Sequence, residues 1–178
     1  MAPSGNSALR PRRALAWGLA LLLASAAALA RGEEHSLEIA PGEAIRYSLV
    51  GGGEASARPT AEKLLRHLAE GDIEGAALLS NAPRRRYEEL ARYRAAVGED
   101  EFKRVFARYF LPANRVVAEI AIGAHRLLIW DLGEAGHHLA GQYYVQTEGR
   151  FLLDDAPGEM RTSLRRLLEA YRSGALRF

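Results

Sequence analysis

The feature that most constrains the fold is a change in the spacing of apolar residues near Asn114. Before this point they recur with the period of an amphipathic helix, as in the set Ala61, Leu64, Leu65 and Leu68. After it they alternate, as in a strand with one buried face, for example Val116, Ala118, Ile120 and Ile122. This order predicts an α+β fold in which N-terminal helices pack on a curved antiparallel meander of about four strands, with a C-terminal helix.

Residues that start and stop helices divide the helical half of the chain. Thr60 is predicted to be the N-cap of a first helix, because its hydroxyl can accept a hydrogen bond from the first turn. Gly71 ends that helix and Asp72 caps the next one. Pro112 ends the helical half, since proline has no N–H to donate. An apolar stripe from Glu159 to Ser173 predicts the C-terminal helix.

The first thirty residues have the pattern of an export signal. Arg10, Arg12 and Arg13 form a basic start, Ala14 to Ala27 is an apolar run, and Ala28-Leu29-Ala30 is a small-residue cleavage site. We therefore predict that residues 1–30 are a signal peptide and that the protein is exported, to the periplasm or outside the cell. An uncleaved membrane anchor is the alternative.

Charge and composition exclude several classes of function. Removal of the three signal-peptide arginines lowers the 24 basic residues to 21, against 22 acidic ones. A nearly neutral exported domain has no net field to attract DNA or RNA, so we expect no nucleic-acid partner. The chain has no cysteine, which excludes disulfides, thiolate metal sites and a cysteine nucleophile. No second long apolar run follows, so no stable membrane span is expected after cleavage.

The rest of the chain divides into three parts. Residues 31–58 contain two short β-like pieces, Leu37 to Ala40 and Ile45 to Val50, followed by a glycine-rich linker. A single α+β domain is predicted from 59 to 173, and 174–178 form a tail.

The element order resembles the nuclear transport factor 2-like superfamily, which includes ketosteroid isomerase and scytalone dehydratase. The residues that carry the resemblance are the helix, Gly-Asp break and second helix from Ala61 to Ala76, and the hairpin with Tyr143-Tyr144-Val145 and Arg150-Phe151-Leu152-Leu153-Asp154. It covers about 59–153, and the C-terminal helix departs from the family's usual ending on a strand. The resemblance implies a cone-shaped sheet around an apolar pocket, often in a dimer, and no particular activity.

Two carboxylates are candidates for catalysis by a cofactor-free lyase or isomerase. Enzymes of the resembled superfamily need an ionised carboxylate and a buried acid or tyrosine that donates to the oxyanion. Glu119 and Asp131 provide the acids, and Tyr143 or Tyr144 the donor. Nothing in the spacing selects this set, and a strand glutamate between two apolar residues is expected on the solvent face. We therefore predict no catalytic residue, with Glu119 and Asp131 as candidates.

A metal site is the second chemical alternative. Asp131, Glu134, His137 and His138 gather around one loop, and imidazole with carboxylate suits zinc or another divalent ion. Adjacent histidines of a strand point to opposite faces, so at most one joins the two acids unless the loop bends. We expect no metal and no cofactor.

The triplet Arg84-Arg85-Arg86 opens a predicted helix, the unfavourable end for positive charge. It suits either a docking patch for an anionic partner, such as a lipid headgroup or an acidic protein, or a hydrated helix start.

These observations favour a binding protein over an enzyme. We predict that it encloses a small apolar ligand, or a partner's hydrophobic segment, between sheet and helices, with Trp130, Tyr143 and Tyr144 as the ligand-binding residues. The alternative is an envelope assembly or structural subunit that dimerises or docks through a sheet face bearing Gln142, Tyr144 and Gln146. Expected partners are thus a small apolar molecule, an envelope protein or a second copy of the chain.

Overall fold

The computed structural model describes residues 33–156 and 158–178. Its elements, in chain order, are β1 (Glu34–Ala40), β2 (Glu43–Leu49), η1 (Gly53–Ala55), α1 (Arg58–Glu70), α2 (Ile73–Ala77), α3 (Pro83–Val97), α4 (Glu99–Ala107), η2 (Arg108–Phe110), β3 (Asn114–Ile122), β4 (His125–Leu132), η3 (Gly133–Ala135), β5 (His138–Thr147), β6 (Arg150–Leu153) and α5 (Glu159–Arg172).

The strands form one six-stranded sheet in the order β1-β2-β3-β4-β5-β6, with every neighbouring pair antiparallel. The predicted α+β class is confirmed, but the count of about four strands was too low, and the helices follow two strands instead of preceding them all. The hairpin β1–β2 joins the sheet through two residue pairs, Ser48 with Ala121 and Leu49 with Ile120. Local spacing predicts a strand but not a partner that lies beyond four helices in the sequence, which is why the sheet was undercounted.

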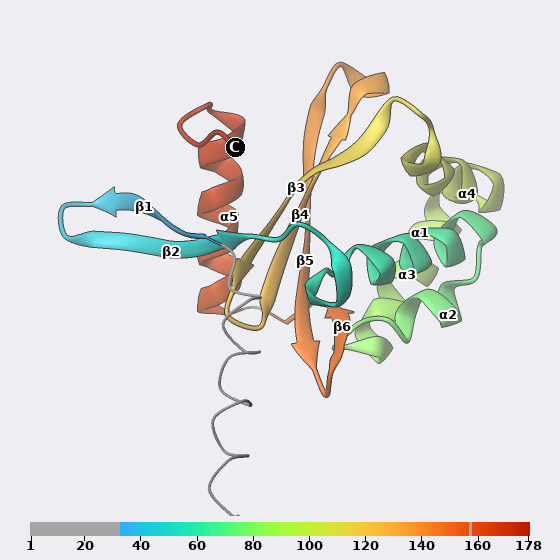
Figure 1. Ribbon diagram of the computed structural model, residues 1–178. Helices are drawn as coiled ribbons and strands as arrows, with labels where there is room; N and C mark the ends of the chain where they lie inside the picture. Colours follow the sequence, from blue (N-terminus) through green and yellow to red (C-terminus); the bar gives the residue numbers. More distant parts are fainter. Residues whose placement is uncertain (1–32, 157) are drawn as a thin grey trace, which may run out of the picture. The chain divides into compact units, whose positions relative to one another are not determined.

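Helices lie on both sides of the sheet. Figure 1 shows α1–α4 beside one face of β3–β6 and α5 beside the other. Successive residues of a strand point to opposite faces, so Leu128 and Trp130 of β4 pack towards α1–α4, whereas Leu127 and Ile129 pack towards α5. The sheet therefore separates two apolar cores, and β4 is buried without interruption from Arg126 to Trp130.

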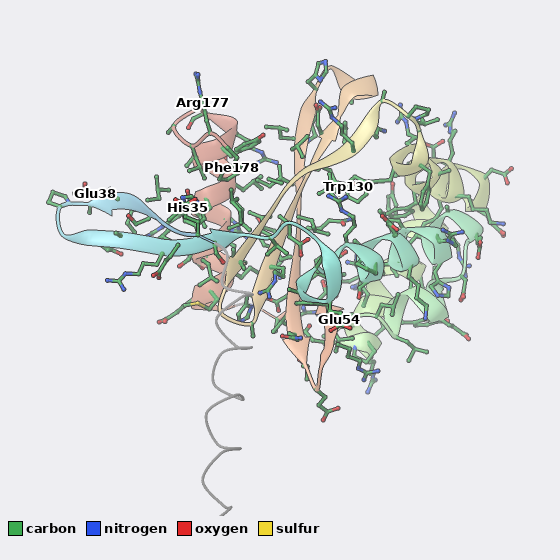
Figure 2. The ribbon with its side chains drawn as sticks, viewed as in Figure 1. His35, Glu38, Glu54, Trp130, Arg177 and Phe178 are labelled. Carbon is green, nitrogen blue, oxygen red and sulfur yellow. The ribbon has the colours of Figure 1, made fainter. Side chains whose placement is uncertain are left out.

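The hairpin β1–β2 packs against α5 and the end of the chain. Ile45 and Tyr47 of β2 are buried in the same core as the inner face of α5. The ring of Phe178 stacks on Tyr171 of α5 with centroids 5.2 Å apart and meets the edge of Tyr47 at 6.3 Å. The ring of His35, which Figure 2 labels, stacks on Tyr47 with centroids 5.4 Å apart. Aromatic contacts thus hold the hairpin where sheet hydrogen bonds are few.

The helix ends follow the predictions in part. Asp72 is confirmed as the N-cap of α2, because its carboxylate accepts a hydrogen bond from the Gly75 N–H at 2.9 Å. The prediction for Thr60 was wrong: α1 begins at Arg58, and the Thr60 hydroxyl donates to the carbonyl of Phe151 at 3.3 Å. That hydrogen bond ties α1 to β6, a contact that local sequence does not encode.

We expect Gly141→Ala to lower the free energy of unfolding by about 1–3 kcal/mol, because an added methyl group overpacks the contact between β5 and α5. A Cβ at this position would lie 2.6 Å from Cδ2 of Leu168 and 3.2 Å from Cδ1 of Leu127, both buried. Urea denaturation measures the change. The control is Gly51→Ala, where a Cβ meets no atom within 4 Å and which should be near neutral. Equal losses in the two variants would contradict the prediction.

The predicted signal peptide, residues 1–30, lies outside the described residues. Within the part of the chain that the structure describes, no helix has the length and apolar character needed to cross a membrane.

Candidate functional site

A row of three side chains crosses the sheet beneath one end of the helical layer. The strand register pairs Val116 of β3 with Trp130 of β4, and Trp130 with Ala140 of β5. Paired residues of neighbouring strands point to the same face, which here is the face towards α1–α4 (Figure 2). The indole of Trp130 is buried, while Val116 and Ala140 remain partly exposed.

Aromatic and aliphatic neighbours extend this row. The ring of Tyr109 in η2 stands edge-on to Trp130, with centroids 5.2 Å apart and an interplanar angle of 89°. Leu132, two residues beyond Trp130 on the same face, is also partly buried. We call these side chains the Trp130 rim: Tyr109, Val116, Trp130, Leu132 and Ala140. The rim is where the core between helices and sheet reaches solvent.

A glutamine provides the polar group beneath the rim. The side-chain oxygen of Gln142 accepts hydrogen bonds from Trp130 Nε1 at 3.0 Å and from the Tyr144 hydroxyl at 3.1 Å. Burial raises the pKa of Tyr144 and that of Tyr109 above the ordinary value of a phenol, so both hydroxyls stay protonated near neutral pH. Sequence reasoning placed Gln142 on an exposed docking face and missed this role.

The three predicted ligand-binding aromatics do not lie together. Trp130 and Tyr144 share Gln142 on the helical face, but Tyr143 points to the α5 face, where the guanidinium of Arg161 lies 5.3 Å from its ring centroid. Burial raises the pKa of Tyr143, and the nearby Arg165 and Arg161 oppose that shift. The face bearing Gln142, Tyr144 and Gln146 is covered by helices at Tyr144, which is fully buried, and is exposed only at Gln146.

Glu119 is buried, in contrast to the solvent-facing position expected of a strand glutamate. It is 4% exposed, and each carboxylate oxygen accepts a hydrogen bond, from the Ser56 hydroxyl at 2.5 Å and from the Ala57 N–H at 2.7 Å. Ala57 is the N-cap residue of α1 and has no side-chain oxygen of its own. Glu119 therefore supplies the negative acceptor that a helix N-terminus favours, from a strand 62 residues away.

Arg126 completes this buried polar region. Its Nε donates to the carbonyl of Ala55 at 3.0 Å, and its guanidinium lies 5.0 Å from the ring centroid of Phe151. Burial lowers the pKa of Arg126 and the charge of Glu119 opposes that shift. Both charged groups thus hold the 55–57 segment against the sheet. Sequence reasoning missed Ser56 and Arg126, and no local signal marks either one.

Asp131 pairs with Leu139 and therefore lies on the face of the sheet towards α5, whereas Glu119 pairs with Leu128 on the opposite face. His137 has a left-handed backbone with φ 62°, and its Nδ1 lies 3.2 Å from both carboxylate oxygens of Asp131. His138 begins β5 and is exposed, and the side chain of Glu134 is not among those described. No group of three or more histidine, aspartate or glutamate side chains suited to a metal ion occurs among the described residues. Of the three metal candidates whose side chains the structure describes, it joins only Asp131 and His137.

Comparisons of the chain with protein-family models, with curated proteins and with solved structures find no match. The likeness to the nuclear transport factor 2-like superfamily therefore stays a prediction, and the function is argued from the geometry.

Proposed function

We propose that this chain is an exported, non-enzymatic binding protein that holds a small apolar molecule, or the hydrophobic segment of a partner, against the Trp130 rim. One observation carries the proposal: apolar side chains from η2, β3, β4 and β5 surround Trp130 at the end of the helix–sheet layer and remain partly exposed. Ligand sites are concave and mostly apolar, with few polar groups that orient the ligand.

The Trp130 rim offers both the apolar surface and the orienting polar group that such a site needs. A ligand that covers the rim removes its exposed apolar area from water, which contributes about 25 cal/mol of favourable free energy for each Å². Gln142 lies directly beneath, held in one orientation by two donors. The position between sheet and helices is also where the superfamily resemblance implies a pocket. The proposal that the protein is exported rests on the sequence pattern of residues 1–30.

A second candidate is an assembly or structural subunit of the envelope. The observation that favours it is the long hairpin β1–β2, whose outer strand β1 pairs only with β2 among the described strands. An edge strand has unpaired backbone groups that can bind another chain. Native mass spectrometry of the full chain distinguishes the candidates, because an assembly subunit is recovered as an oligomer or with a partner protein.

The binding proposal predicts that the neutral probe N-phenyl-1-naphthylamine binds at the rim and becomes more fluorescent. We expect Tyr109→Ala to weaken this binding by about tenfold, since it removes the ring that covers Trp130. The matched control, Tyr171→Ala, removes a partly buried ring of α5, on the other side of the sheet, and should leave the affinity unchanged. Tyr109→Phe keeps the ring and should restore binding. Absence of probe binding, or an equal loss of affinity in both alanine variants, would contradict the proposal.

A further inference from the structure

A pocket of about 420 Å³ lies at the beginning of α5, and none of its residues belongs to the Trp130 rim. It is lined by Arg85, Asp155, Gly158, Arg161, Thr162 and Arg165. Three of these side chains are cationic and one is anionic. They come from the first turn of α3, the loop after β6 and the first turns of α5, so the fold collects them from separate parts of the chain.

The carboxylate in the pocket is already engaged. Asp155 Oδ2 accepts a hydrogen bond from the Ser80 hydroxyl at 2.6 Å, and Oδ1 lies 3.7 Å from Nη1 of Arg86. Arg86 does not line the pocket, so it balances the charge of Asp155 from outside it. This leaves the charges of Arg85, Arg161 and Arg165 in excess.

The two arginines of α5 that line the pocket, Arg161 and Arg165, form no ion pair with a carboxylate among the described residues. Arg161 is held by a hydrogen bond from Nη1 to the carbonyl of Asp154 at 2.9 Å and by its position over the ring of Tyr143. Its Nε is buried and makes no hydrogen bond. Burial raises the pKa of Tyr143, and Arg165 lies close enough to that phenol for its charge to oppose the rise. Aromatic and backbone contacts thus hold Arg161 in place, and they neutralise neither its charge nor that of Arg165.

The arginine triplet of α3 separates into three roles. Arg84 pairs with Glu88 at 3.2 Å and Arg86 with Asp155, whereas Arg85 lines the pocket. Its Nε is 3.7 Å from Glu89, in a contact between two half-exposed side chains. Such exposed pairs contribute little, so the charge of Arg85 stays available to a ligand.

We propose that this pocket binds a phosphate group. A guanidinium presents several N–H donors in a plane and suits phosphate oxygens, and three of them match the number of oxygens and the charge of a phosphate better than those of a carboxylate. The dipole of α5 adds to the attraction, although the exposed Glu159 in its first turn acts against it. The phosphate comes either from a small soluble ester or from a lipid headgroup. This inference does not depend on the Trp130 rim.

The test is titration calorimetry of the full chain with glycerol 3-phosphate, with acetate as the carboxylate probe. We expect the double variant Arg85→Gln/Arg165→Gln to bind the phosphate at least about tenfold more weakly. The matched control is Arg84→Gln/Arg166→Gln, which removes the same charge from the neighbouring positions, neither of which lines the pocket. It should retain the affinity of the parent. Sedimentation with phosphatidylglycerol vesicles identifies a lipid source, through the same dependence on Arg85 and Arg165.

Each result decides the proposal. Binding of the soluble ester or of the vesicles that is lost in the first double variant and kept in the second supports it. Equal losses in the two variants indicate a response to net charge and overturn it. Equal affinity for acetate overturns the assignment to phosphate, and so does the absence of binding to both the ester and the vesicles. All four substituted side chains are exposed, so folding is expected to be unaffected.

Discussion

Glu119→Ala is expected to lower the free energy of unfolding by about 3–4 kcal/mol. The substitution leaves two donors, the Ser56 hydroxyl and the Ala57 N–H, without their acceptor in a buried region. It also removes the carboxylate whose charge acts on the buried Arg126. Urea denaturation followed by circular dichroism gives the change, provided that the slope against denaturant stays constant.

Two further variants separate these contributions. Ser56→Ala removes one donor and leaves Glu119 bound to Ala57, so we expect a loss of about 1 kcal/mol. Glu62→Ala removes an exposed carboxylate from α1 and should change stability by less than about 0.5 kcal/mol. If Glu119→Ala costs no more than Glu62→Ala, Glu119 does not hold the start of α1 and the structural role assigned to it is wrong.

Phe102→Ala is expected to cost about 3–5 kcal/mol, because it opens a cavity in the core beneath the helices. Phe102 is fully buried, and its ring contacts those of Phe106 and Tyr93, with centroid distances of 5.0 and 5.7 Å. The contact with Tyr93 joins α4 to α3, so its loss loosens the helical layer. The free energy of unfolding in urea measures the effect.

The same substitution at Phe110 provides the control. Phe110 is 48% exposed and ends η2, so its replacement by alanine leaves little cavity. We expect Phe110→Ala to cost less than about 1 kcal/mol. Similar losses at the two positions would show that Phe102 contributes no more than a surface ring.

Local signals predicted several features that the structure contains. Adjacent residues of a strand point to opposite faces, and Tyr143 and Tyr144 of β5 accordingly pack into different cores. The pair Glu148-Gly149 between two strand-like segments is typical of a two-residue hairpin, and both residues have the positive φ of such a turn between β5 and β6, 52° and 78°. Each of these features depends on neighbours in the sequence.

Other features depend on distant parts of the chain and were not predictable. Tyr144 was considered for an exposed docking face, yet helices cover it because α1–α4 fold back over that face of the sheet. His137 and Asp131 approach because the loop bends at a positive φ, which a simple strand pattern does not indicate. The candidate site therefore needed the structure, in particular the contact of Tyr109 with Trp130 and the two donors on Gln142.

The sequence by itself determined which segments are helices or strands, because apolar spacing indicates both. It assigned sides only where a strand is regular: Val116 was expected on the same face as Ala118, but a bulge between them puts Val116 in the helical core and Ala118 in the core beside α5. Only the tertiary structure decided what covers each side. The hydrogen bond between Ser56 and Glu119 spans 63 residues, and the arginines of the pocket lie on two separate helices. The period of the apolar residues shows which side of its own helix or strand a residue faces. The packing of the elements against one another decides which other residues it contacts.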